Sequence, residues 1–110
     1  CLKKKKSKRL VRMLVKIHNA NGRVVVSIAD EKIIGKEFED GEKYLKISEH
    51  FYKGERKSDE ETIKCLKNAS SLNIVGKKSI DFALKNKLIE TGHVLTIGKI
   101  SYAIVVFYAK

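Results

Sequence analysis

The fold is decided by residues 13–28, which read MLVKIHNANGRVVVSI. Before the turn, apolar and polar side chains alternate, which is the pattern of a strand with one buried face. Asn21 and Gly22 then separate this run from a second one rich in valine, and both residues tolerate the positive φ angles of a tight turn. The segment therefore predicts an antiparallel β-hairpin.

Two helices are predicted in the second half of the chain. Ser58 and Glu61 have the spacing of a capping box, in which each side chain bonds the backbone N–H of the other residue. A helix is therefore expected to begin after Ser58 and to end between residues 68 and 71. A second helix begins near Gly76, where four apolar residues follow at helical spacing: Ile80, Ala83, Leu84 and Leu88.

The end of the chain predicts a second hairpin, with strands over residues 94–97 and 100–108 joined by Gly98 and Lys99. The final strand is apolar on both faces, so we expect it to lie inside the sheet. Residues 30–57 contain only short apolar steps between turns, which indicates an irregular segment. These elements predict one α+β domain over residues 13–110, with an N-terminal β-hairpin, an irregular acidic middle, two helices and a C-terminal β-hairpin in one mixed sheet.

Charge is sorted along the chain, which carries a formal net charge of +11. Residues 1–29 hold nine Lys or Arg and no acid, and residues 62–110 hold eight against two acids. Residues 30–61 between them hold eleven acids against seven Lys or Arg. Solubility alone would not sort the signs in this way, so two basic ends favour a polyanion as the partner.

Residues 1–12 form a basic N-terminal arm with no periodicity that could bury a face. Repulsion between such close cations is relieved best by phosphates, so the arm is predicted to bind RNA. Its candidate contacts are Lys3, Lys4, Lys5, Lys6, Lys8, Arg9 and Arg12. A second interpretation stays open, in which the arm is an artefact of expression or of gene-start choice, because Met13 resembles a start.

A second group of candidate RNA contacts belongs to the second helix and the residues after it: Lys77, Lys78, Lys85 and Lys87. If Gly76 begins that helix, its free backbone N–H groups and the two adjacent lysines form a contact for a phosphate. The alternative is a glycine N-cap with solvated lysines, and the sequence leaves both open.

Gly76-Lys77-Lys78-Ser79 also resembles the end of a nucleotide-binding P-loop. A P-loop would have its first glycine at position 71 and a buried strand directly before that position. Position 71 is Ser71, and we predict no buried strand before it. The three histidines are far apart, without the spacing of a metal site, and no nucleophile motif is visible. We therefore expect no catalytic turnover, no cofactor and no metal.

The composition argues against a membrane-spanning or secreted protein. No apolar run approaches the roughly 20 residues that span a bilayer, and charges interrupt the only stretch that could act as a signal-peptide core. Two cysteines, Cys1 and Cys65, allow at most one disulfide and provide no framework for a secreted protein. We expect a cytoplasmic protein with neither a membrane nor a small-molecule substrate as partner.

In the order of its motifs, the chain resembles the archaeal domain-of-unknown-function family 424. The matching pieces are spread over about nine-tenths of the chain, from Met13 to Phe107, and are residues 13–17, 30–36, Phe38, Gly41, 51–54, 73–76, Ala83, Val94, and Ile97 with Gly98. The resemblance implies an archaeal source, a cytoplasmic setting and a link to RNA or translation. It brings no catalytic residues, and residues 1–12 fall outside it.

The function predicted from these observations is RNA binding, as a ribosomal or ribosome-associated protein among ribosomal RNA and neighbouring ribosomal proteins. Phosphate contacts by the arm and the basic C-terminal half would supply the affinity, with little reading of bases. Two alternatives stay open. One is a DNA-binding or chromatin-type basic protein, and the other is a small enzyme acting on RNA or nucleotides.

Overall fold

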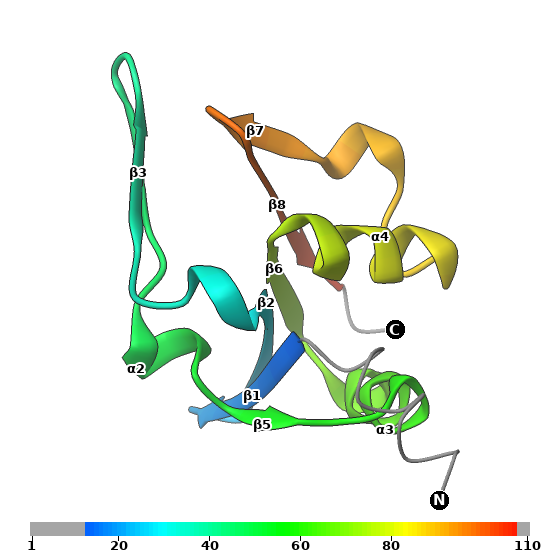
Figure 1. The fold of residues 1–110 in the computed structure, drawn as a ribbon. Coiled ribbons are helices and arrows are strands. Elements are labelled where there is room, and N and C mark those ends of the chain that lie inside the picture. Colours follow the sequence, from blue (N-terminus) through cyan, green and yellow to red (C-terminus); the bar gives the residue numbers. More distant parts are fainter. Residues whose placement is uncertain (1–12, 108–110) are drawn as a thin grey trace, which may run out of the picture.

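A computed structural model describes residues 13–107, which form a mixed six-stranded sheet with helices against it (Figure 1). In spatial order the strands are β5 (Glu55–Arg56), β1 (Met13–Ala20), β2 (Arg23–Asp30), β6 (Ser71–Val75), β8 (Ile100–Val106) and β7 (Leu95–Ile97). Strands β2 and β6 are parallel, and all the other neighbours in this sheet are antiparallel. The α+β class predicted from the sequence is confirmed.

Both predicted hairpins are present. Strands β1 and β2 pair along their whole length, and the turn between them holds Asn21 at φ 52° and Gly22 at φ 78°. A turn whose two central residues both have positive φ angles matches the right-handed twist of the flanking strands, which is why Asn-Gly is a strong signal for a hairpin. Strands β7 and β8 are joined through Gly98, also at a positive φ, and β8 lies between two strands as expected.

Strand β6 is the central strand that the sequence interpretation missed, and the short elements of residues 30–57, which it expected to be irregular, were missed as well. Strand β6 lies at the centre of the sheet, where Leu72, Ile74 and Val75 are buried, and it ends directly before Gly76. The sequence interpretation expected no buried strand directly before position 71, and that expectation is not contradicted, because β6 begins at Ser71 and a 3₁₀ turn (Leu66–Asn68) comes before it. Only five residues long, with Ser71 and Asn73 on one side, the strand is too short and too polar to be distinguished from a connection between helices.

The main core lies on one side of the sheet, which we call the helix face because α3 (Asp59–Cys65) and α4 (Lys77–Lys85) cover it. Alternate strand residues point into this core, since side chains in a strand alternate between its two faces. The members from the strands include Val26, Ile28, Leu72, Ile74 and Ala103, and α4 adds Ile80, Phe82 and Ala83.

The opposite side, which we call the hairpin face, is covered in part by the middle of the chain. That segment forms a 3₁₀ turn (Glu31–Ile33), a small second sheet of β3 (Glu37–Asp40) and β4 (Lys43–Lys46), and a short helix α2 (Glu49–Tyr52). A second, smaller core forms beneath these elements around the buried residues Ala29, Ile47 and Val75. The β3–β4 hairpin projects from this side, opposite α4 (Figure 1).

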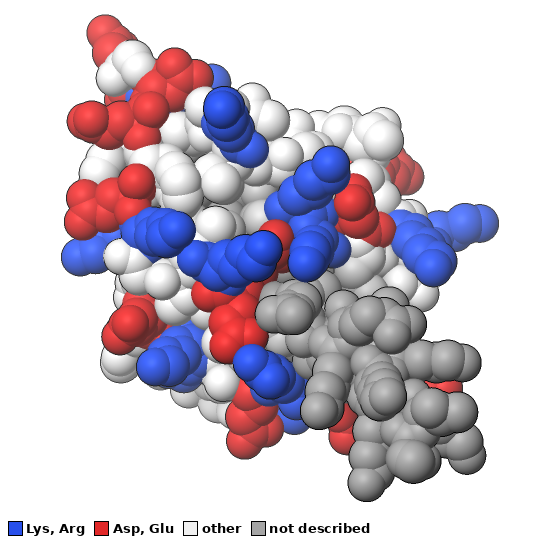
Figure 2. Space-filling model, viewed as in Figure 1, with Lys and Arg blue, Asp and Glu red and all other residues white. Residues whose placement is uncertain are grey.

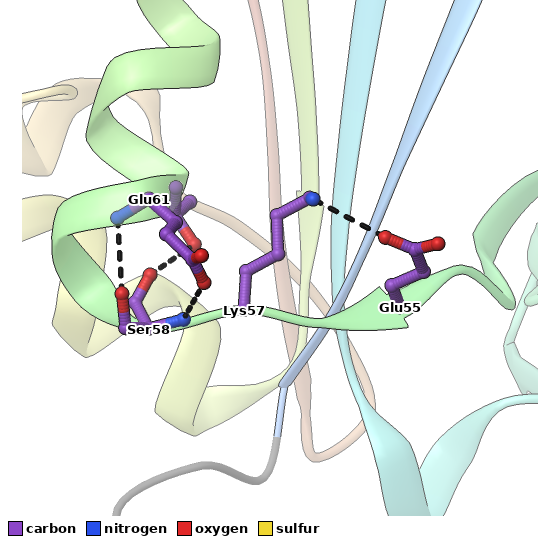
Figure 3. Close-up of polar contacts among 5 residues, drawn as sticks. Glu55, Lys57, Ser58 and Glu61 are labelled. Carbon is purple, nitrogen blue, oxygen red and sulfur yellow. Dashed lines mark hydrogen bonds and ion pairs between the residues drawn. The ribbon is translucent and has the colours of Figure 1, made fainter.

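Helix α3 begins as the sequence predicts. The Ser58 Oγ accepts the Glu61 N–H at 3.1 Å, and the Glu61 carboxylate accepts the Ser58 N–H at 3.0 Å (Figure 3). Just before the helix, Lys57 pairs with Glu55 at 3.3 Å, and this hydrogen bond raises the pKa of the lysine. The capping box therefore determines where α3 begins. Among residues 13–107, no helix is long and apolar enough to cross a bilayer.

Candidate nucleic-acid interface

The first turn of α4 is held by a carboxylate from another strand. Asp30, the last residue of β2, accepts the Lys78 N–H at 3.1 Å and the Ser79 N–H at 2.8 Å. The Ser79 hydroxyl donates to the same carboxylate at 2.7 Å, and this serine is fully buried. Because β2 and β6 run parallel as neighbours, their carboxyl ends lie side by side, which brings Asp30 to the start of α4.

This contact corrects the phosphate contact predicted for the start of α4. The expectation that its backbone N–H groups are free for an RNA phosphate is wrong for Lys78 and Ser79, because the Asp30 carboxylate already accepts both. A negative group at a helix N-terminus is favourable for the same electrostatic reason that a phosphate would be. A phosphate contact here would therefore use the lysine side chains or the Lys77 N–H, and not the N–H groups of Lys78 and Ser79.

The same geometry bears on the resemblance to a P-loop. Strand β6 begins at the position where the first glycine should stand and so does not precede it, and a single residue, Gly76, connects β6 to α4. A P-loop needs a longer glycine-rich segment whose N–H groups surround the phosphates. The position where its first glycine should stand is Ser71, inside β6. The segment therefore lacks the loop of backbone N–H groups with which a P-loop binds phosphates.

Four predicted lysines are exposed around α4. Lys77, Lys78 and Lys85 belong to the helix, and Lys87 follows it with φ 60°. Asp81, also exposed, lies one helical turn from Lys77 and from Lys85. Among residues 13–107 the ion pairs are Arg56–Glu31 and Lys57–Glu55, so these lysines form none with a described acid.

The acidic side chains are most concentrated on the β3–β4 hairpin, which projects away from α4. In Figure 2, acidic side chains gather at the upper left, over the projecting β3–β4 hairpin, whereas the middle and the right of this view carry basic side chains with acidic ones between them. The hairpin supplies Glu37, Glu39, Asp40 and Glu42. Asp30 also belongs to the acidic middle by sequence, but it caps the basic helix.

The predicted arm contacts, Lys3, Lys4, Lys5, Lys6, Lys8, Arg9 and Arg12, lie outside the described residues. Within residues 13–107, no three acidic, histidine or cysteine side chains converge as a metal site would require. Sequence reasoning missed Asp30 as a partner of α4. An acid at the end of one buried strand, with a second buried strand followed directly by Gly-Lys-Lys-Ser, is the signal that would have indicated it.

Replacing Asp30 with alanine is expected to lower the free energy of unfolding by about 2–3 kcal/mol, because two N–H groups and a buried hydroxyl lose a charged acceptor. An asparagine side chain would keep one acceptor oxygen, so Asp30→Asn should cost less than Asp30→Ala. Urea denaturation of the three proteins measures both differences. A control is Asp81→Ala, which removes an exposed carboxylate of the same helix. Equal effects of D30A and D81A would contradict the capping role.

Comparisons with known proteins place the fold. No curated protein matches the chain. The crystal structure of an uncharacterized conserved protein from Methanopyrus kandleri is similar, with a TM-score of 0.73 over 89% of this chain and 95% of that chain. At 18% identity this likeness shows a shared fold alone. The family model described as "Protein of unknown function (DUF424)" matches residues 18–107, and the chain therefore belongs to the DUF424 family.

Proposed function

We propose that the protein binds RNA through phosphate contacts, as a ribosomal or ribosome-associated protein in the cytoplasm of an archaeal cell. The observation that carries the proposal is the group of exposed lysines on and after α4, which form no ion pair with a described acid. Lysine side chains that are not neutralised within the protein can release counterions from a polyanion, and this release drives affinity for nucleic acids.

The distribution of charge supports a polyanion that approaches from the α4 side. The carboxylates of the β3–β4 hairpin lie on the opposite side of the sheet, where they would repel phosphates least. Lysine ammonium groups act as point charges and read no base pattern, so contacts around α4 would fix position more than sequence. The basic arm, residues 1–12, would add to the same attraction.

The proposal is tested by the salt dependence of RNA binding. Changing Lys77 and Lys78 to glutamine should flatten the log–log slope of affinity against salt by about 1.4 for single-stranded RNA, if each lysine contacts one phosphate. The matched control changes Lys43 and Lys46 of the acidic hairpin, which are also exposed. That control should leave the slope unchanged, and circular dichroism should be the same for both variants.

Two results would contradict this assignment. Equal flattening by the α4 pair and by the hairpin pair would mean that net charge, and not location, determines binding. No flattening by the α4 pair would leave these lysines merely solvated. Competition between ribosomal RNA and duplex DNA in the same titration separates RNA binding from the behaviour of a general basic DNA-binding protein, for which the duplex DNA would compete equally.

A further inference from the structure

Part of the hairpin face is open, although it lies at the centre of the sheet. The register places Ser71 between Val25 and Val106, and Asn73 beside Ile104. We call these five residues the open patch. Ile104 and Val106 are 61% and 56% exposed, the largest exposed fractions among the apolar residues of the sheet. The elements on this side pack against the other end of the strands, around Ala29 and Val75.

The two polar residues of the open patch have unused hydrogen-bonding groups. The Asn73 amide bonds no other group among residues 13–107, and the Ser71 hydroxyl likewise has no partner there; both residues are half-buried. Asparagine is depleted in β-strands. Its presence in the central strand β6 is therefore not explained by strand propensity. A side-chain amide offers a donor and an acceptor together, which suits the edge of a nucleotide base.

A stacked aromatic pair borders the open patch. His18, which pairs with Val25 across β1 and β2, lies against the Phe51 ring with centroids 4.4 Å apart and an interplanar angle of 13°. The Phe51 carbonyl oxygen holds this arrangement, because it lies 2.9 Å from the His18 Nε2 and accepts the buried Ser27 hydroxyl at 2.8 Å. Flat rings held in this way are surfaces on which a base can stack.

Charge favours a nucleic acid over a basic partner. Alternation along the strands puts Lys16 and Arg23 on the hairpin face with Val25, whereas Asp30 and Glu55 point to the other side. No described strand of the six-stranded sheet presents a carboxylate on this face. The nearest acids belong to the covering elements, on α2 and the β3–β4 hairpin.

We infer that the open patch binds unpaired RNA bases. Val25, Ile104 and Val106 would contact base surfaces, Ser71 and Asn73 would bond base edges, and Arg23 would meet a phosphate. The inference rests on the proposed function and deepens it, because it assigns the reading of single strands to the sheet and leaves phosphate attraction to α4. Duplex RNA cannot use this surface, since its bases are stacked and paired.

The test compares a labelled oligouridine with an RNA duplex of the same length. Changing Ile104 and Val106 to serine should weaken oligouridine binding about tenfold, because one base loses its apolar surface, and should leave the duplex affinity unchanged. Asn73→Ala is the second variant and should act in the same direction. The matched control is Ile17→Ser, an apolar residue 41% exposed on the helix face, which should change neither affinity.

The outcomes separate the two proposals. Oligouridine binding that is insensitive to both patch variants, or a loss shared equally with the duplex, overturns the role of the open patch and leaves RNA binding in place. A wild-type protein that binds neither RNA overturns the proposed function and this inference together. A photo-crosslink from 4-thiouridine to the peptide that contains Ile104 and Val106 would support the assignment, and crosslinks confined to α4 would oppose it.

Discussion

Replacing Gly54 with alanine is expected to lower the free energy of unfolding by about 3 kcal/mol, since overpacking against rigid neighbours carries a cost of this size. A Cβ on Gly54 would overlap the Val15 carbonyl oxygen, and it would stand 2.6 Å from the Val15 carbonyl carbon and 2.8 Å from the Lys16 Cα. All three atoms belong to the backbone of β1, which cannot move without disturbing its pairing with β2. Strand β5 would have to separate from β1.

The matched control for this variant is Gly92→Ala. A Cβ at Gly92 meets nothing within 4 Å, and neither Gly92 nor Gly54 has a left-handed φ, so the two variants differ in available space. Gly92→Ala should change the unfolding free energy by no more than about 0.5 kcal/mol. Chemical denaturation of both variants measures the difference. Equal midpoints would show that β5 is not held against β1 as described.

The second large effect is expected for Gly76→Ala, at about 4 kcal/mol when backbone strain and a lost charged cap are combined. Gly76 has φ 108° and ψ 148°, a conformation almost confined to glycine. A Cβ there would overlap the Asp30 carboxyl carbon and would lie 2.7 Å from each carboxylate oxygen. Asp30 would be displaced from the start of α4, and its three hydrogen bonds would weaken.

Two comparisons isolate the part of the Gly76→Ala destabilisation that comes from displacing Asp30. Gly22→Ala has a positive φ but open space around its Cβ, so it should cost only about 1 kcal/mol, which is the strain of the backbone conformation. In a background that already carries Asp30→Ala, the change at Gly76 should cost at least about 1 kcal/mol less than in the wild type. Thermal or urea unfolding of the four proteins in this cycle gives the coupling. Additive effects would mean that the two residues do not meet.

The parts of the fold that were predictable depend on neighbours in sequence. The Asn21-Gly22 turn, the Ser58–Glu61 capping box and the start of α4 each follow from local backbone requirements, and the structure contains all three. Strand β6 was not predictable in this way. Its place is determined by β2 and β8, which are distant in sequence, and its own five residues include the polar Ser71 and Asn73.

In the candidate interface too, features that depend on neighbours in sequence were predictable, and features that depend on distant strands were not. The exposure of Lys77, Lys78, Lys85 and Lys87 agrees with the sequence interpretation, because solvated lysines on an amphipathic helix are a local property. Asp30 belongs by sequence to the acidic middle, and its contact with α4 depends on the parallel pairing of β2 and β6. The open patch was invisible for the same reason, since its members come from three separate strands.

The parallel pairing of β2 with β6 also has a consequence for how the chain reaches this structure. Residues 31–70 separate the two strands, so closing this loop costs about 3 kcal/mol of chain entropy before the central pairing can return any stability. The β1–β2 hairpin needs no such closure and can form early. Because the chain contains no proline, no prolyl isomerisation can delay folding. We therefore expect the pairing of β6 with a preformed β1–β2 hairpin to be the slow step of folding.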